Sequence, residues 1–131
     1  MNLAEAHLTD LSPRLRELVE IIGLPAAVKL IEARGGTRLY VPRKAEEDRL
    51  LVRLIGRPAA AKLMRRYGGD VIELDRGVRG LRAVRNRAII AESEHRSAMQ
   101  LALKYQLTER QVWKILERAA RVNRRQLALS L

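Results

Sequence analysis

Apolar residues recur at helical spacing along most of the chain, with polar residues between them. Near the start, four apolar residues lie at the i, i+3, i+4, i+7 spacing of one helix face. These are Leu15, Leu18, Val19 and Ile22. Ser12 can cap this helix, and Pro13 suits its first turn. Gly23 then ends the pattern, which predicts a first helix over residues 13–22.

The pattern occurs twice in the N-terminal part of the chain. Residues 18–36 (LVEIIGLPAAVKLIEARGG) and 51–69 (LVRLIGRPAAAKLMRRYGG) are identical at 11 of 19 positions. Each copy predicts a helix, a Gly-x-Pro break, a second helix, a Gly-Gly stop and a short strand. We expect Gly35 to take the left-handed conformation that caps a helix. The β-prone stretches that follow predict strands over residues 37–42 and 70–74.

Two such copies make a small core for about 75 residues, and a lone strand leaves unpaired backbone groups at its edges. Both problems disappear if two chains dimerise, because helices are then pooled and strands are paired. We therefore expect a homodimer through this region; the alternative is that the two strands pair within one chain. The residues expected at the dimer interface are Leu15, Leu18, Val19, Ile22, Leu39, Tyr40, Val41, Leu51 and Leu54.

The strongest functional pattern lies in residues 97–116 (SAMQLALKYQLTERQVWKIL). It contains two capping boxes, over residues 97–100 and 108–111, and each marks the start of a helix. The small and apolar residues around the turn at residues 106–107 are those that two helices need to cross closely. This arrangement is typical of a helix-turn-helix. A further helix expected over residues 81–94 completes a three-helix unit.

The predicted fold is therefore mainly α with one or two short β-strands. We expect a helical dimerisation domain over residues 1–75 and a helix-turn-helix domain over residues 82–131. The linker between them, residues 76–81, contains Gly77 and Gly80, which favours a turn or hinge. The tail from Arg121 either extends the last helix or frays.

Charge is distributed unevenly over these parts. The 131 residues carry a formal net charge of +11, with 26 Lys and Arg against 15 Asp and Glu. Residues 1–75 hold 13 basic and 11 acidic residues, whereas residues 76–131 hold 13 and 4. A net charge of +9 on the C-terminal part favours a module that binds a polyanion such as nucleic acid. The alternative is a solvated basic surface with no partner.

The second helix of the motif, expected over residues 108–119, is the candidate recognition helix. Arg110 is the best candidate to read a guanine through two hydrogen bonds. Glu109 either accepts a hydrogen bond from cytosine or only favours the helix dipole, and Trp113 either contacts DNA or packs against the domain. The residues expected to contact DNA from this helix are Thr108, Glu109, Arg110, Trp113, Lys114 and Arg118. Phosphate contacts are expected from Arg82, Arg85 and Arg87 on the preceding helix.

Catalytic chemistry finds little support in the sequence. The absence of cysteine excludes disulfides, thiolate metal sites and a cysteine nucleophile. The two histidines, His7 and His95, do not form a zinc-binding pair, and no glycine-rich loop precedes a helix to cradle phosphate. We expect neither an enzyme nor a metal or cofactor site. No apolar run approaches the ~18 residues that span a bilayer, and no signal layout opens the chain, so we expect a cytoplasmic protein with no membrane partner.

The order of these features resembles the middle operon regulator (Mor) family of Mu-like phage transcription activators. The resemblance spans about residues 15–118 and rests on three strings: GGTRLYVP (35–42), Arg85-Asn86-Arg87, and LALKYQLTERQV (101–112). It implies a homodimer whose strands pair between chains and whose helix-turn-helix modules bind an inverted-repeat promoter site on double-stranded DNA. It also implies that the protein engages host RNA polymerase to activate middle or late phage genes.

The sequence therefore predicts a homodimeric, sequence-specific DNA-binding transcription activator of phage or prophage origin. Two alternatives stay open at this point. One is a nucleoid-type or RNA-binding protein that uses the same basic surface without reading sequence. The other is a regulator that contacts only proteins, in which the C-terminal module docks on polymerase.

Overall fold

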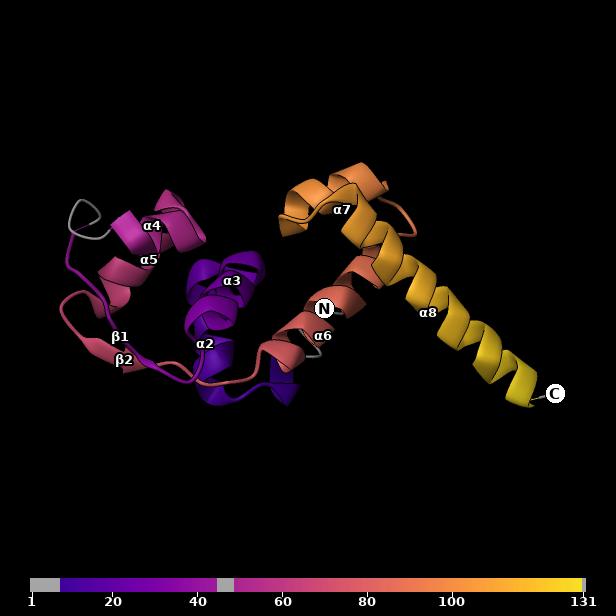
Figure 1. Cartoon of the computed structure of the whole chain (residues 1–131), viewed down its shortest axis with the longest axis horizontal. Helices are drawn as coiled ribbons and strands as arrows, with labels where there is room; N and C mark the ends of the chain where they lie inside the picture. The colour runs from indigo at the N-terminus through magenta and orange to yellow at the C-terminus, as the bar shows by residue number, and fades with distance from the viewer. Residues whose placement is uncertain (1–7, 45–48, 131) are drawn as a thin grey trace.

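The computed structural model describes residues 8–44 and 49–130, and this part of the chain is mainly helical (Figure 1). It contains a short 3-10 helix, seven α-helices and one two-stranded sheet. In chain order the elements are η1 (Leu8–Asp10), α2 (Pro13–Ile22), α3 (Leu24–Arg34), β1 (Arg38–Tyr40), α4 (Arg49–Ile55), α5 (Arg57–Tyr67), β2 (Val71–Glu73), α6 (Val78–Glu92), α7 (Ala98–Tyr105) and α8 (Glu109–Ser130).

The helix boundaries of the first repeat follow the expected caps. The Ser12 hydroxyl accepts a hydrogen bond from the Leu15 N–H at 3.3 Å, and Pro13 occupies the first turn of α2. Gly23 separates α2 from α3 at a φ of +85°. The expectation for Gly35 is wrong by one residue: Gly35 has a φ of −56°, and Gly36 takes the positive φ of +83°. The chain needs the left-handed residue where it leaves the helix for the strand, one step after the cap.

The two strands pair with each other within one chain, antiparallel, with Leu39 opposite Ile72 and Tyr40 opposite Val71. Pairing within one chain, the alternative that the sequence left open, is thus the arrangement in the structure. Leu39 and Ile72 face the core, whereas Tyr40 and Val71 are 56% and 61% exposed on the outer face. A second chain is therefore not required to pair the strands.

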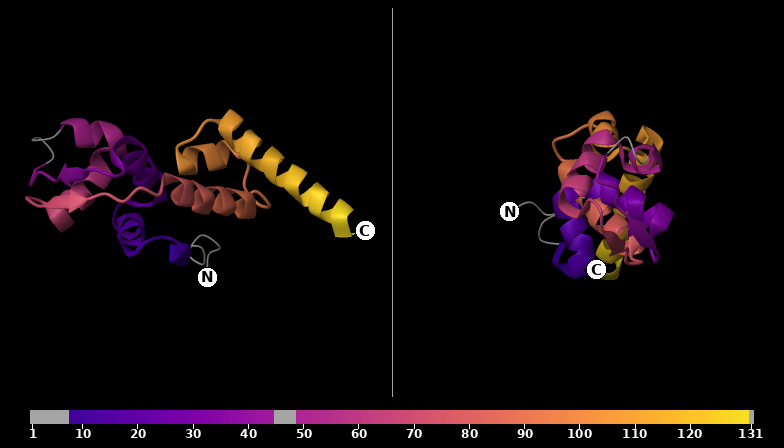
Figure 2. Two further views of the ribbon diagram at one scale, coloured as in Figure 1. Left: turned by 60° about the horizontal axis from the view of Figure 1, so that its bottom comes forward. Right: turned by 90° about the vertical axis from the view of Figure 1, so that its left-hand side faces the viewer.

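Two hydrophobic cores form in the described residues, and helix α6 contributes to both. The first core combines α2 to α5 and the sheet with Leu81 and Val84 of α6. The second core joins Ala88 and Ile89 of α6 to α7 and α8. Figures 1 and 2 show α6 between the N-terminal helices and the pair α7 and α8. One continuous helix thus connects the two parts of the chain.

The linker expected over residues 76–81 also differs from the structure, because α6 begins inside it. Residues 78–81, the second part of the expected hinge at 76–81, are helical, and Gly77 at a φ of +145° precedes the first turn of α6. Leu81 is fully buried in the first core. Its burial anchors the start of α6 against the N-terminal helices. The non-helical segment between β2 and α6 is therefore limited to residues 74–77.

Most residues expected at a dimer interface lie in the core of the chain itself. Val19 and Leu54 are partly buried and pack against that core, and Tyr40 is exposed. The remaining six are fully or nearly fully buried: Leu15, Leu18, Ile22, Leu39, Val41 and Leu51. These apolar positions are satisfied within one chain, which their spacing along the sequence could not reveal.

Helix α8 is longer than the expected recognition helix. It runs to Ser130, so the tail extends the helix, and its end projects away from the other elements (Figures 1 and 2). Side chains from Ala120 to Ser130 are all exposed. Within the described chain, no helix combines the length and the apolar character needed to cross a membrane.

Candidate nucleic-acid interface

Two capping boxes fix the starts of α7 and α8, the two helices that the sequence predicts to form a helix-turn-helix. In α7 the Gln100 N–H donates to the Ser97 hydroxyl at 3.1 Å, and the Gln100 side chain accepts from the Ser97 N–H at 2.9 Å. In α8 the Gln111 N–H donates to the Thr108 hydroxyl at 3.1 Å, with the reciprocal bond at 2.9 Å. These reciprocal bonds satisfy amide groups that a helix start otherwise leaves unpaired.

The turn between α7 and α8 is held in a left-handed conformation. Gln106 has a φ of +56°, the one positive φ outside glycine in the described residues. The Leu107 N–H donates to the Ala102 carbonyl at 2.9 Å, which closes the turn. The Lys29 ammonium of α3 donates to the Gln106 side chain. The turn is therefore tied both to α7 and to the N-terminal helices.

The crossing of α7 and α8 sets the direction in which α8 presents its side chains. Ala102 and Val112 are 6% and 0% exposed where the helices meet. Ala102 gives the close approach expected from its small side chain, and Val112 fills the space on α8. With Val112 turned inward, the residues one helical half-turn away face solvent. The first turns of α8 thus form an exposed surface on a rigid support.

The expected recognition residues lie on this surface. Thr108, Glu109 and Arg110 are exposed at the N-terminal end of α8. Arg110 has no hydrogen bond or ion pair with any described residue, so its guanidinium is available to a ligand. Trp113 is 59% exposed, which excludes full burial in the domain, although it lines a hollow together with Ser97 and Ala98 at the start of α7.

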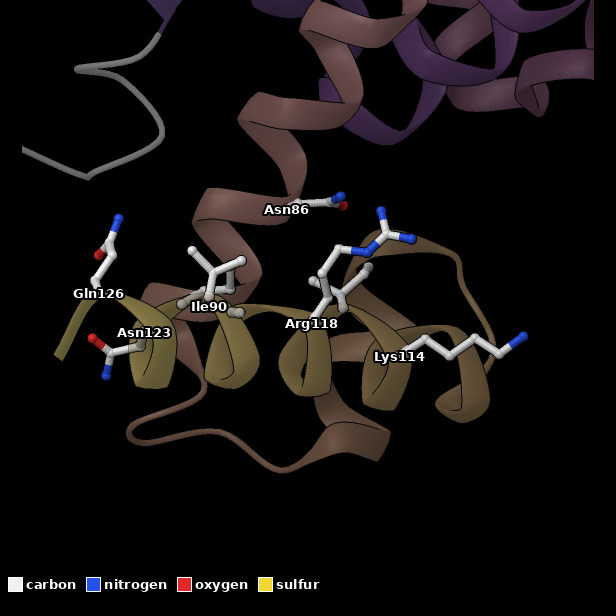
Figure 3. Close-up of a pocket in the computed structure, with 9 residues that line it drawn as sticks. Asn86, Ile90, Lys114, Arg118, Asn123 and Gln126 are labelled. Carbon is white, nitrogen blue, oxygen red and sulfur yellow. The ribbon is translucent and has the colours of Figure 1, made fainter. Parts of the chain in front are cut away.

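Lys114 and Arg118 lie about one and two turns beyond Arg110 on α8, at the edge of a hollow beside α6. This hollow has a volume of about 480 Å³. Figure 3 shows Asn86 and Ile90 reaching it from α6, with the Arg118 side chain directed towards α6 and Lys114 extending away. Lys114 is therefore the better placed of the two to reach a phosphate beside the recognition surface.

The three arginines of α6 do not form one phosphate-binding row. Arg82 is ion-paired with Glu32 at 3.1 Å, and burial lowers the pKa of the half-buried Arg85. Both line a hollow that also contains Gln106 and Gln111, so they lie near the start of α8. Arg87 pairs instead with Asp10 at 3.6 Å, away from that hollow. The structure brings Arg82 and Arg85 towards the start of α8 and leaves Arg87 apart.

Sequence reasoning missed the role of Glu92 at the end of α6. Its carboxylate accepts hydrogen bonds from the Tyr105 hydroxyl and the Lys104 ammonium of α7. Burial alone would raise the pKa of Glu92, but these hydrogen bonds outweigh it and lower the pKa. Burial and the bond to Glu92 raise the pKa of Tyr105. The detectable signal was a tyrosine at a core position, because a buried hydroxyl needs a partner.

The acidic and histidine side chains do not gather into a metal site. Within residues 8–44 and 49–130, no group of three or more such side chains lies close enough together to hold a metal ion. Glu92 faces α7 through Tyr105, and Glu117 pairs with Arg121 at 2.7 Å on the surface of α8.

Comparison with known proteins gives one match. The model of the Mor transcription activator family matches residues 47–131, which is more than half of the chain. The matched range contains the second repeat and helices α6, α7 and α8, and it leaves the first repeat outside. Neither the curated proteins nor the solved structures contain a match to the chain.

Proposed function

Because the chain belongs to the Mor transcription activator family, we propose that it binds double-stranded DNA sequence-specifically and activates middle or late genes of a phage or prophage. The family consists of transcription regulators and not of enzymes. The observation that carries the proposal is the rigidly supported start of α8, where the unpaired Arg110 is exposed.

The start of α8 enters the major groove in this proposal, where base edges differ for each base pair. Arg110 donates two hydrogen bonds to a guanine, and Glu109 and Trp113 contact neighbouring bases. The Thr108 hydroxyl and its adjacent backbone lie where a helix N-terminus attracts a phosphate. These contacts supply the sequence preference.

Phosphate contacts supply most of the affinity. Lys114 and Arg118 flank the exposed surface at the start of α8, and Arg82 and Arg85 approach that surface from α6. The net charge of +9 over residues 76–131 attracts the DNA backbone from a distance. Arg82 exchanges its pairing with Glu32 for a phosphate when DNA binds.

Activation requires a second surface that stays free on DNA, and we propose that host RNA polymerase contacts the end of α8. Val122, Leu127 and Leu129 are 50%, 58% and 87% exposed there. The basic residues among them, Arg121, Arg124 and Arg125, are exposed as well. A basic helix with apolar positions suits an acidic, partly apolar protein surface.

A homodimer on an inverted repeat is a second candidate arrangement. The strands β1 and β2 pair antiparallel within one chain, and the same pairing can form between two chains if the strands are exchanged. Such an exchange would bring the residues expected at the interface, among them Leu39 and Val41, between two chains.

The test is binding of the purified chain to fragments of its own genomic neighbourhood, with a salt titration and excess random competitor DNA. The proposal predicts a complex on one fragment that resists the competitor. If random duplex or RNA competes the protein off every fragment, and the salt dependence of binding is the same for all of them, the chain is a non-specific nucleic-acid-binding protein. Polymerase binding without any DNA binding would favour the regulator that contacts only proteins.

A further inference from the structure

The glycine breaks and corners of the two repeats adopt the same backbone conformation. Gly23 and Gly56, which occupy equivalent positions in the two repeats, have φ angles of +85° and +86°. Gly36 and Gly69, a second equivalent pair, have φ angles of +83° and +88°. We call α2, α3 and β1 the first unit, and α4, α5 and β2 the second unit. Their equivalence extends from the sequence to the geometry of each break and turn.

Hydrogen bonds between the units come in equivalent pairs. The Gly36 N–H donates to the Leu74 carbonyl at 2.8 Å, and the Gly69 N–H donates to the Val41 carbonyl at 2.7 Å. Exchanging each residue for its counterpart in the other repeat turns each of these bonds into the other. Leu39 and Ile72, which face each other, are themselves counterparts in the two repeats. A pseudo-twofold axis thus passes through the sheet between Leu39 and Ile72.

The helices obey the same symmetry. α2 of the first unit packs against α5 of the second, and α4 of the second packs against α3 of the first. Outside the strands, the Arg76 side chain lies against Gly36, and the Arg43 side chain lies against Gly69. The two units therefore contact each other through equivalent surfaces.

Reciprocal contact of this kind is the defining property of a twofold homodimer interface. Here both halves belong to one chain. The apolar residues of the interface are almost all buried, from Leu18 in the first unit to Leu51 and Leu63 in the second. The family match covers the second unit and begins after the first, so only one of the two units lies within it.

We propose that the first unit is a built-in partner that occupies the self-complementary surface of the second unit. One chain then forms a closed monomer with a single helix-turn-helix. The DNA consequence rests on the proposed function: each chain reads one half-site by itself. The closed monomer does not rest on it, because it concerns the protein without DNA.

The first experiment measures the mass of the wild-type chain in solution without DNA, by light scattering over a hundredfold range of concentration. A closed monomer gives 14.9 kDa throughout. A mass of twice that value, constant or rising with concentration, overturns the proposal. No variant is needed, so this result does not depend on whether a substituted chain folds.

The second experiment identifies which chain supplies each strand. Tyr40 and Val71 face each other on the exposed side of the sheet. The next pair along the strands, Val41 and Asp70, is hydrogen-bonded, because the Val41 N–H donates to the Asp70 carbonyl. Tyr40 and Val71 are therefore a non-hydrogen-bonded pair, whose side chains lie close enough for a disulfide. The chain has no cysteine of its own, so the variant Tyr40→Cys/Val71→Cys reports on this contact alone.

Oxidation of the double variant is expected to give a disulfide within one chain and no covalent dimer. The matched control mixes the single variants Tyr40→Cys and Val71→Cys, unfolds and refolds them together, and oxidises the mixture. A covalent heterodimer in that mixture means that the strands are exchanged between chains and overturns the proposal.

The DNA arm measures the mass of the complex on a duplex that carries the bound site. On a duplex that carries a single half-site, a specific complex with one chain supports the proposal, and a complex that forms only with two chains contradicts it. A monomer that binds no DNA specifically would remove the proposed function and leave the closed monomer intact. The two failures are therefore distinguishable.

Discussion

Arg110 combines three properties that a base-reading side chain needs. It lies at the start of α8, it is exposed, and no described residue competes for its guanidinium. We expect Arg110→Ala to cost about 1–3 kcal/mol on the cognate site and to relax one base position. Titration against a panel of single-base variants of the site measures both effects.

The matched control is Arg124→Ala, an exposed arginine on the same helix but beyond the helix-turn-helix. It is expected to leave the base preference unchanged. If Arg110→Ala weakens binding to every sequence by the same factor, Arg110 is only an electrostatic contact and does not read a base.

Glu92 makes the stability of the helix-turn-helix depend on pH. Its pKa is lowered in the folded chain, so its charged form stabilises the fold. This contribution is complete above the unfolded pKa of about 4.3 and is lost as the pH falls through the folded pKa. We expect Glu92→Gln to lower the free energy of unfolding by about 1 kcal/mol at neutral pH and to flatten its fall in acid.

Urea titrations at several pH values between neutral and acid test this expectation. Glu94→Gln is the control, because Glu94 is an exposed neighbour. An acid dependence that is equally steep in Glu92→Gln and in the wild type would show that other carboxylates control it.

At the scale of elements, the Gly-Gly corners connect each helix pair to its strand. The second glycine of each corner has a positive φ, which an L-residue adopts only at a cost. A Cβ at Gly36 would lie 2.6 Å from Nε of Arg76, and one at Gly69 would lie 2.8 Å from Nε of Arg43. We expect Gly36→Ala and Gly69→Ala to lower the free energy of unfolding by similar amounts, about 1–2 kcal/mol each.

Chemical denaturation of the two variants side by side measures these costs. Because the corners are equivalent, a clear loss in one variant with none in the other would contradict the pseudo-twofold arrangement.

Elements were predictable where one residue determines a local hydrogen bond. Ser12, Ser97 and Thr108 cap helices because their hydroxyls accept from nearby amides, and that chemistry is visible in the sequence. The turn at Gln106 was also placed correctly, although glycine is the usual residue there.

Elements were not predictable where distant residues decide. The start of α6 depends on Leu81 entering a core built from α2 to α5, so local glycines suggested a hinge instead. The bond from Tyr105 to Glu92 joins two different helices, and no local pattern shows it. Strand pairing likewise depends on tertiary contacts. The hydrophobic pattern around Leu39 and Ile72 is compatible with pairing within one chain and with pairing between two chains.

For the whole molecule, salt dependence separates cations that face DNA from those that do not. Lys114 is exposed beside the reading surface, whereas Arg87 pairs with Asp10 on another side of α6. We expect Lys114→Ala to reduce the slope of log affinity against log salt by about 1, and Arg87→Ala to leave it unchanged.

Affinity measurements over a range of salt concentrations on one duplex provide both slopes. Equal changes in the two variants would mean that the basic surface binds DNA diffusely, without a defined orientation.

In the proposed function, this chain reads DNA sequence through the start of α8. The most direct measurement is selection of bound sites from a random duplex library, with the wild-type chain and Arg110→Ala in parallel. We expect one enriched motif for the wild type, and we expect the variant to lose the base preference at a single position of that motif. Recovery of no motif, or of the same motif with both proteins, would contradict it.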